Sequence, residues 1–88
     1  MEINNAIDIV RKERPDSLIV SCIDYQDSFI FTVCPKDDPK SSSSATYILN
    51  KKTKVFSHCE HIVGLLFDHQ NDPEFMKAFE NAILIDKI

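Results

Sequence analysis

Glycine and tryptophan are almost missing from this sequence, since its 88 residues include one glycine and no tryptophan. Phosphate-binding loops such as GxGxxG and the P-loop need two or more glycines at fixed spacing, so these nucleotide-binding motifs are excluded. An excess of positive charge is missing as well: 10 lysines and arginines stand against 14 aspartates and glutamates, and the formal net charge is −4. A mildly acidic chain has no general attraction to a phosphate backbone, so we expect no nucleic-acid partner.

Long hydrophobic runs are also missing. The longest run, residues 62–67, is far shorter than the roughly 20 residues that a membrane-spanning helix needs. Acidic residues interrupt the N-terminal segment, which therefore does not resemble a secretory signal. The three cysteines, Cys22, Cys34 and Cys59, are an odd number and do not form the pattern of a disulfide framework. We therefore expect a cytoplasmic protein with reduced thiols and no membrane contact.

The composition favours a globular core, because 43% of the residues are hydrophobic and 27% are charged. We expect one domain over residues 1–88. Its first segment, 3–14, predicts a helix, because basic residues occupy its last turn and Pro15 follows it. Apolar residues recur there at the spacing of one helix face, namely Ile3, Ala6, Ile7 and Val10.

Residues 18–25 and 28–34 are rich in β-branched and aromatic residues, and they predict two antiparallel strands joined by a short turn. A turn of two or four residues gives the same alternation of faces, whereas a turn of three would exchange the partners. With an even turn, one face carries Val20, Cys22, Phe29, Phe31 and Val33. The other face carries Ile19, Ile23, Ile30 and Thr32.

Residues 35–45 include two prolines and four serines and have little to bury, so we expect a mobile loop there. A second hairpin follows, with strands over 46–50 and 54–57. A four-residue turn places Tyr47, Leu49 and Phe56 on one face and Ile48 and Val55 on the other. Because both faces of the sheet are then apolar, we expect helices on both sides, with a homodimer or partner interface as the alternative.

Two helix start signals lie in the last third of the chain. Residues 57–60 fit the S-x-x-E capping box, which predicts a helix over 58–69. Asp72-Pro73 predicts a last helix that extends to about Leu84. Its expected inner face carries Phe75, Phe79, Ala82 and Ile83. The expected fold class is α+β, with an N-terminal helix, a four-stranded antiparallel sheet of two hairpins, and two C-terminal helices.

The cluster His58-Cys59-Glu60-His61 is the first candidate for chemistry. On a helix His58 and His61 could share a face with Cys59 nearby, but zinc needs about four ligands and no CxxC or HxxxH pair supplies the rest. A thiol at a helix N-terminus is favoured as a thiolate, but Cys59 has no evident acid partner or oxyanion loop. We assign no catalytic residue, no cofactor and no metal, and we keep His58, Cys59 and His61 as the alternative site.

Carboxylate pairs occur at Asp37-Asp38 and at Asp24 and Asp27. All four lie in expected turns, where aspartate is favoured because it bonds to nearby backbone. We expect no apolar pocket beside either pair that would raise a carboxyl pKa. General acid catalysis therefore has no support.

Four segments resemble small uncharacterised proteins of bacterial and prophage genomes. These are Ala6-Ile7-x-Ile9-Val10, Val20-Ser21-Cys22-Ile23-Asp24-Tyr25, Phe29-x-Phe31 and Tyr47-Ile48-Leu49-Asn50-Lys51-Lys52-Thr53-Lys54-Val55. Residues 3–56 are also similar to YrhB-type immunity proteins of bacterial toxin systems, in which a helix precedes a meander that ends in an Asp/Asn-Lys-x-Thr-Gly-like turn. Lys54 stands where that turn usually has glycine, and the tryptophan common in the immunity group is absent.

The resemblance carries over no catalytic residue and implies a partner-binding role. We therefore expect a non-enzymatic protein-binding domain, either immunity-like or an accessory protein of a mobile element. The alternative is a small metal-binding protein or thiol enzyme that uses the 58–61 cluster. The sequence leaves the partner, the interaction residues and the choice between monomer and homodimer open.

Overall fold

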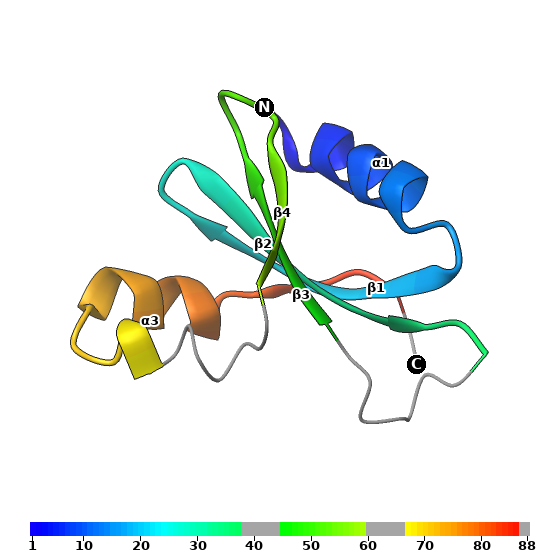
Figure 1. Cartoon of the computed structure of the whole chain (residues 1–88). Helices are drawn as coiled ribbons and strands as arrows, with labels where there is room; N and C mark the ends of the chain where they lie inside the picture. The colour runs from blue at the N-terminus through cyan, green and yellow to red at the C-terminus, as the bar shows by residue number, and fades with distance from the viewer. Residues whose placement is uncertain (38–44, 60–66, 87–88) are drawn as a thin grey trace.

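The computed structural model describes residues 1–37, 45–59 and 67–86. These residues form, in chain order, α1 (Ile3–Glu13), β1 (Ser17–Tyr25), β2 (Ser28–Pro35), β3 (Ala45–Asn50), β4 (Phe56–Cys59), α3 (Pro73–Glu80) and β5 (Ile83–Leu84) (Figure 1). The strands make an antiparallel sheet in the order β4-β3-β2-β1-β5. The α+β class is confirmed, but the described sheet has five strands instead of the expected four.

Helix α1 covers one face of the sheet. Its side chains Ala6 and Val10 are fully buried, as the helical spacing predicts. They pack on a core that the sheet provides from three strands: Ile19, Cys22, Phe29, Phe31, Val33, Tyr47 and Leu49. Ile3, Ile7 and Ile9 are half-buried against the same core.

A bulge in β1 changes which side chains reach this core. The pairing of β1 with β2 shifts between Ile19 and Ser21, so that Val20 is the extra residue. Without the bulge, Ile19 and Cys22 would point to opposite faces, because their separation is odd. With it, Ile19 joins Cys22 in the α1 core and is 1% exposed, while Val20 is half-buried. The predicted placement of Val20 in this core and of Ile19 on the other face was therefore wrong.

Helix α3 packs on the opposite face of the sheet. There Ile23, Ile30 and Phe75 form a second buried cluster, flanked by the partly buried Tyr25 and Ile48. Figure 1 shows α1 and α3 on different sides of the strands. The expectation of a helix on each side of a two-faced apolar sheet is thus confirmed.

The C-terminal third differs most from the expectation. Residues 56–59 form β4, in which Ser57 pairs with Ile48 and His58 pairs with Tyr47. The helix predicted to start at His58 was wrong there, because cross-strand pairing with β3 extends past Ser57. Residues 60–66 of that prediction lie outside the described residues, and Phe67 and Asp68 have helical backbone.

The last helix is also shorter than predicted. Helix α3 ends at Glu80, and Ile83–Leu84 form β5 beside β1, where Cys22 pairs with Ile83. The backbone N–H of Asp86 continues this pairing by donating to the carbonyl of Ile19. The predicted loop over 35–45 begins one residue later, since Pro35 ends β2, and Ala45 already belongs to β3. Residues 38–44 of that loop are not among the described ones.

No helix within residues 1–37, 45–59 and 67–86 is long and apolar enough to cross a membrane.

Candidate functional site

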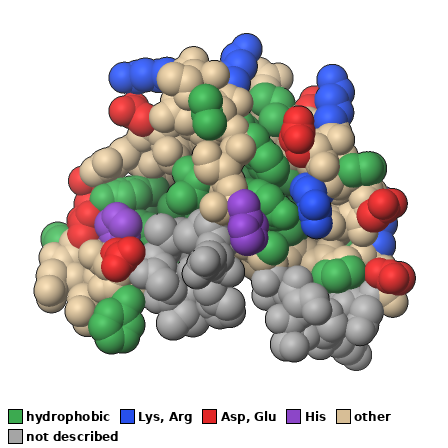
Figure 2. All heavy atoms as spheres, in the orientation of Figure 1, with side chains coloured by type: hydrophobic (Ala, Val, Ile, Leu, Met, Phe, Trp, Pro, Cys, Tyr) green, Lys and Arg blue, Asp and Glu red, His purple; other side chains and the backbone are tan. Residues whose placement is uncertain are grey.

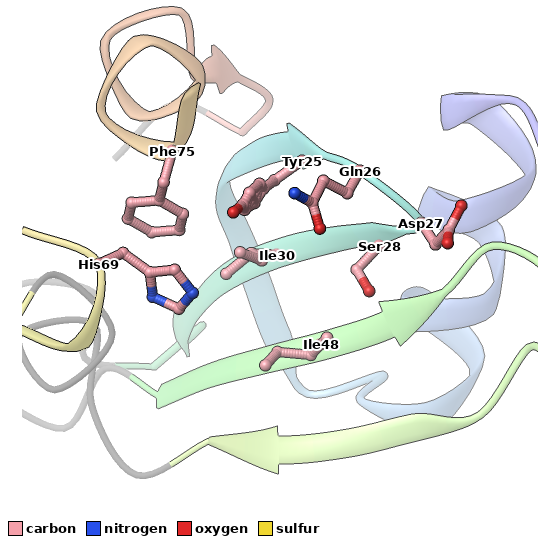
Figure 3. Close-up of a pocket in the computed structure, with 8 residues that line it drawn as sticks. All are labelled: Tyr25, Gln26, Asp27, Ser28, Ile30, Ile48, His69 and Phe75. Carbon is pink, nitrogen blue, oxygen red and sulfur yellow. The ribbon is translucent and has the colours of Figure 1, made fainter. Parts of the chain in front are cut away.

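A cavity of about 230 Å³ lies between the sheet and the N-terminal end of α3 (Figure 3). Its lining comes from the β1–β2 turn, from β2 and β3, and from the segment around α3. The lining residues are Tyr25, Gln26, Asp27, Ser28, Ile30, Ile48, His69 and Phe75.

The sheet supplies the apolar floor of this cavity. Ile30 of β2 and Ile48 of β3 are direct cross-strand partners, so their side chains lie together on the α3 face. Beside them, Tyr25 pairs with Ser28 across a two-residue turn. Gln26 in this turn has a φ of 50°, and that left-handed conformation closes the hairpin tightly. The even turn predicted from the sequence is confirmed.

Three aromatic rings form a wall of the cavity. The rings of His69 and Phe75 are stacked, with centroids 4.5 Å apart and an interplanar angle of 23°. Tyr25 meets both rings edge-on, with centroid distances of 5.7 Å to His69 and 5.0 Å to Phe75. Phe75 is fully buried, so the wall is anchored in the hydrophobic cluster under α3.

A hydrogen bond fixes the Tyr25 end of this wall. The Tyr25 hydroxyl donates to Oδ2 of Asp72, while Oδ1 of Asp72 accepts from the backbone N–H groups of Glu74 and Phe75 at 3.0 and 3.3 Å. Asp72 is therefore the N-cap of α3, as Asp72-Pro73 predicts. The bond to Asp72, followed by desolvation, raises the pKa of Tyr25 to about 12. The same bond lowers the pKa of the Asp72 carboxyl below its ordinary value.

The electrostatic environment of the cavity is acidic. Asp27 belongs to its lining, and the carboxylates of Asp72 and Glu74 both raise the pKa of the Tyr25 hydroxyl. Two basic side chains lie close to these carboxylates. His69 belongs to the same lining, and Nζ of Lys52 lies 3.6 Å from Oδ1 of Asp27. In Figure 2, acidic side chains lie at the left of the molecule beside α3, while acidic and basic side chains are mixed at the top and right.

The position of Asp27 corrects one expectation. We expected no apolar pocket beside Asp24 and Asp27, yet Asp27 lines a cavity that contains Ile30 and Ile48. Asp24 is on the other side of the sheet, where its carboxylate bonds to the ammonium group of Lys51 and Lys51 lies over the Phe29 ring. Only one of the two turn aspartates therefore belongs to the site.

The structure places His58 of the predicted cluster in a strand. The ring of His58 is exposed on β4, and its centroid lies 5.1 Å from that of Tyr47. Cys59 is the last residue of β4 and pairs with Thr46, while Glu60 and His61 lie outside the described residues. The described residues contain no group of three or more potential metal ligands. A metal-binding or thiol role for residues 58–61 stays a prediction. It assumed that His58 and Cys59 begin a helix, whereas both lie in strand β4.

The other two cysteines, Cys22 and Cys34, are buried in the sheet. Cys22 is fully buried, and Cys34 is 3% exposed. Burial raises the pKa of Cys22 to about 12, and it also raises the pKa of Cys34. Because both pKa values are raised, both thiols are protonated at neutral pH and are not in the reactive thiolate form.

Sequence reasoning did not identify the cavity, because its wall joins residues far apart in the chain. The Asp72-Pro73 signal correctly placed Phe75 in the first turn of a helix, and strand alternation placed Ile30 and Ile48 on a shared face only after pairing was assumed. The contact between Tyr25 and Asp72, separated by 47 positions, leaves no local pattern.

The fold and the cavity define the class as a small α+β domain with a helix on each face of an antiparallel sheet. No family model matches the chain, and no curated protein and no solved structure matches it.

Proposed function

We propose that this protein is a non-enzymatic domain that binds a protein partner through the cavity between the sheet and α3. The observation that carries the proposal is the cavity itself, an aromatic wall and an apolar floor with a polar turn beside them. Interface hot spots have this character, since they combine a well-packed apolar pocket with a few polar groups.

The size of the cavity favours a side chain over a small molecule. Its volume of about 230 Å³ is below the roughly 300–1,000 Å³ of typical small-molecule sites. Such a space suits one side chain of a partner, whose remaining contacts would be made on the surrounding surface.

Two exposed aromatic residues belong to the segments that supply part of the cavity lining. Phe79 follows Phe75 by one helical turn on α3 and is 37% exposed. Phe67, two residues before the cavity residue His69, is 71% exposed. Exposed aromatic side chains on these segments add apolar surface that a protein partner could cover.

The protonation chemistry around the cavity favours binding over catalysis. A tyrosine with a pKa of about 12 holds its proton at neutral pH and is a poor base. Asp72 has a lowered pKa and is occupied as an N-cap, so it is a poor general acid. An immunity-like or mobile-element accessory role, which the sequence resemblance predicts, is one form of such partner binding.

Photocrosslinking tests this function. Phe79 is replaced by p-benzoylphenylalanine, and the protein is irradiated in a lysate of its source cells. We expect one adduct that unlabelled wild-type protein competes away. Val55, an exposed apolar residue on the β3–β4 connection, receives the same replacement as a matched control and should give no such adduct.

Equal adducts from both positions would contradict the proposal, because the labelling would then be unspecific. An adduct that contains only a second copy of this chain would replace the proposed partner by a homodimer. Absence of any adduct that wild-type protein competes away would also count against the proposed function.

A further inference from the structure

We infer that the cavity takes the cationic side chain of a lysine or arginine from a basic segment of the partner. The inference rests on the proposed function, since it names the chemistry of the group that occupies the same site. Charge complementarity and the nature of the cavity wall carry it.

The charge argument starts from the carboxylates that surround the cavity. Asp27 is part of the lining, Asp72 bonds to the lining residue Tyr25, and Glu74 also acts on that hydroxyl. The whole chain has a net charge of −4, so its field attracts basic segments over a longer range. An acidic partner residue would instead be repelled both by the carboxylates at the cavity and by the net negative charge of the chain.

The cavity wall suits the two parts of a lysine or arginine side chain. The aliphatic stem can pack on Ile30 and Ile48, while the charged head reaches the Asp27 carboxylate at the β1–β2 turn (Figure 3). Arginine and lysine side chains bury their aliphatic stems along apolar surface while the charged head keeps polar contacts. A neutral apolar side chain would fill the space but leave the carboxylate of Asp27 without a new partner.

The protein already shows the same type of contact at Asp27. Lys52 lies 3.6 Å from this carboxylate, but the two side chains are 75% and 65% exposed. An ion pair this exposed contributes little, so an incoming cation can replace Lys52 at small cost. Lys52 is therefore a competitor for the site.

A peptide titration tests the inference with three probes, the capped tripeptides Gly-Arg-Gly, Gly-Lys-Gly and Gly-citrulline-Gly. Citrulline has nearly the shape of arginine without its charge. Binding is followed by amide chemical shifts in ¹H–¹⁵N spectra. We expect the arginine and lysine peptides to shift Gln26, Ser28 and Phe75 saturably and to bind at least tenfold more tightly than the citrulline peptide.

Two aspartate variants provide a matched comparison. Asp24 and Asp27 are both exposed, both belong to the β1–β2 hairpin and both pair with a lysine of the β3–β4 connection. Asp27→Asn should weaken binding of the arginine peptide about three- to tenfold, whereas Asp24→Asn should leave it unchanged. Lys52→Met should tighten binding about two- to threefold, because it removes the internal competitor.

Equal binding of the citrulline peptide, equal effects of the two aspartate variants, or no saturable shift would each overturn the inference. Crosslinking at Phe79 reports on the proposed function whatever the chemistry of the bound group. A specific adduct together with no preference for charge would leave the function standing and remove the cationic ligand. A clear preference for charge without any adduct at Phe79 would leave the cationic ligand standing and remove the proposed partner binding.

Discussion

Arg11 and Asp86 lie 75 positions apart and form an ion pair through two hydrogen bonds, with Nη1–Oδ2 and Nη2–Oδ1 distances of 3.2 and 3.0 Å. The same Oδ2 atom accepts from the backbone N–H of Ile19 at 2.8 Å. Asp86 thereby joins the C-terminal tail to α1 and to the start of the β1 bulge. One carboxylate holds together three segments that the sequence separates.

We predict that Asp86→Asn lowers the free energy of unfolding by about 1–2 kcal/mol. Hydrogen bonds to charged groups contribute about 1.5–3 kcal/mol each, and partial exposure of Arg11 reduces that value. Urea denaturation at neutral pH measures the change. The exposed Asp37 provides the control, and Asp37→Asn should alter stability by less than about 0.5 kcal/mol.

The effect of Asp86→Asn should depend on pH with a defined sign. The hydrogen bonds from Arg11 lower the pKa of Asp86 below its ordinary value of 3.8. A carboxylate with a lowered pKa in the folded state contributes stability above its unfolded pKa and loses it as the pH falls through the folded one. The difference between wild type and variant should therefore be complete at pH 7 and shrink below about pH 4. A difference that grows in acid would contradict the ion pair.

Local patterns explain which parts of the fold could be predicted. Helix α1 and the β1–β2 hairpin follow from periodicity over adjacent residues, and both were predicted nearly to their ends. The bulge at Val20 was missed, because one extra residue in an apolar run leaves no mark in composition. It was enough to exchange the faces of Ile19 and Val20.

The C-terminal errors have a different cause, since tertiary pairing prevailed over local signals there. Ser57 fits a capping box, yet its pairing with Ile48 keeps it in β4. Ile83 fits the inner face of a helix, yet it pairs with Cys22 after α3 has ended. The cavity could not be predicted either, because Tyr25 and Phe75 lie far apart in the sequence and their contact leaves no local pattern.

The hydroxyl of Tyr25 should titrate at unusually high pH. Its hydrogen bond to Asp72 is the largest of the causes that raise its pKa from 10.0 to about 12. The chain has two tyrosines, so Tyr47→Phe leaves Tyr25 as the single reporter in a tyrosinate absorbance titration. Adding Asp72→Asn should bring the midpoint down toward 10. Adding Glu74→Gln should move it much less, since Glu74 is the smallest of the causes.

The sign of the corresponding stability effect is also fixed. Because the folded-state pKa of Tyr25 is raised, its stabilising contribution is present below the ordinary value of 10.0 and is lost as the pH approaches 12. A midpoint near 10 both with and without Asp72 would show that the hydrogen bond is absent in solution.

We predict that glycine at position 54 increases the stability of the fold. Its φ of 61° lies in the left-handed region, where a side chain costs about 1–2 kcal/mol. Glycine avoids this cost but loses more backbone entropy, so Lys54→Gly should stabilise the fold by about 0.5–1 kcal/mol. Thermal denaturation measures the effect.

Lys52→Gly provides the matched control for this turn. Lys52 is exposed, has the same charge and is not among the residues with positive φ. Glycine there brings the entropic loss without relief of strain, so it should destabilise the fold by about 0.5–1 kcal/mol. Equal destabilisation by both substitutions would show that Lys54 is not strained.

The buried thiols of Cys22 and Cys34 are predicted to resist chemical modification in the folded protein. Their exposed fractions are 0% and 3%, and burial raises the pKa of both, which disfavours the reactive thiolate. In a Cys59→Ser background these are the two remaining cysteines, so reaction with Ellman's reagent reports on them alone. We expect almost no reaction at neutral pH in buffer and complete reaction of both thiols in denaturing urea. Rapid modification of Cys22 in buffer would contradict the β1 register, because the bulge at Val20 is what places Ile19 and Cys22 together under α1.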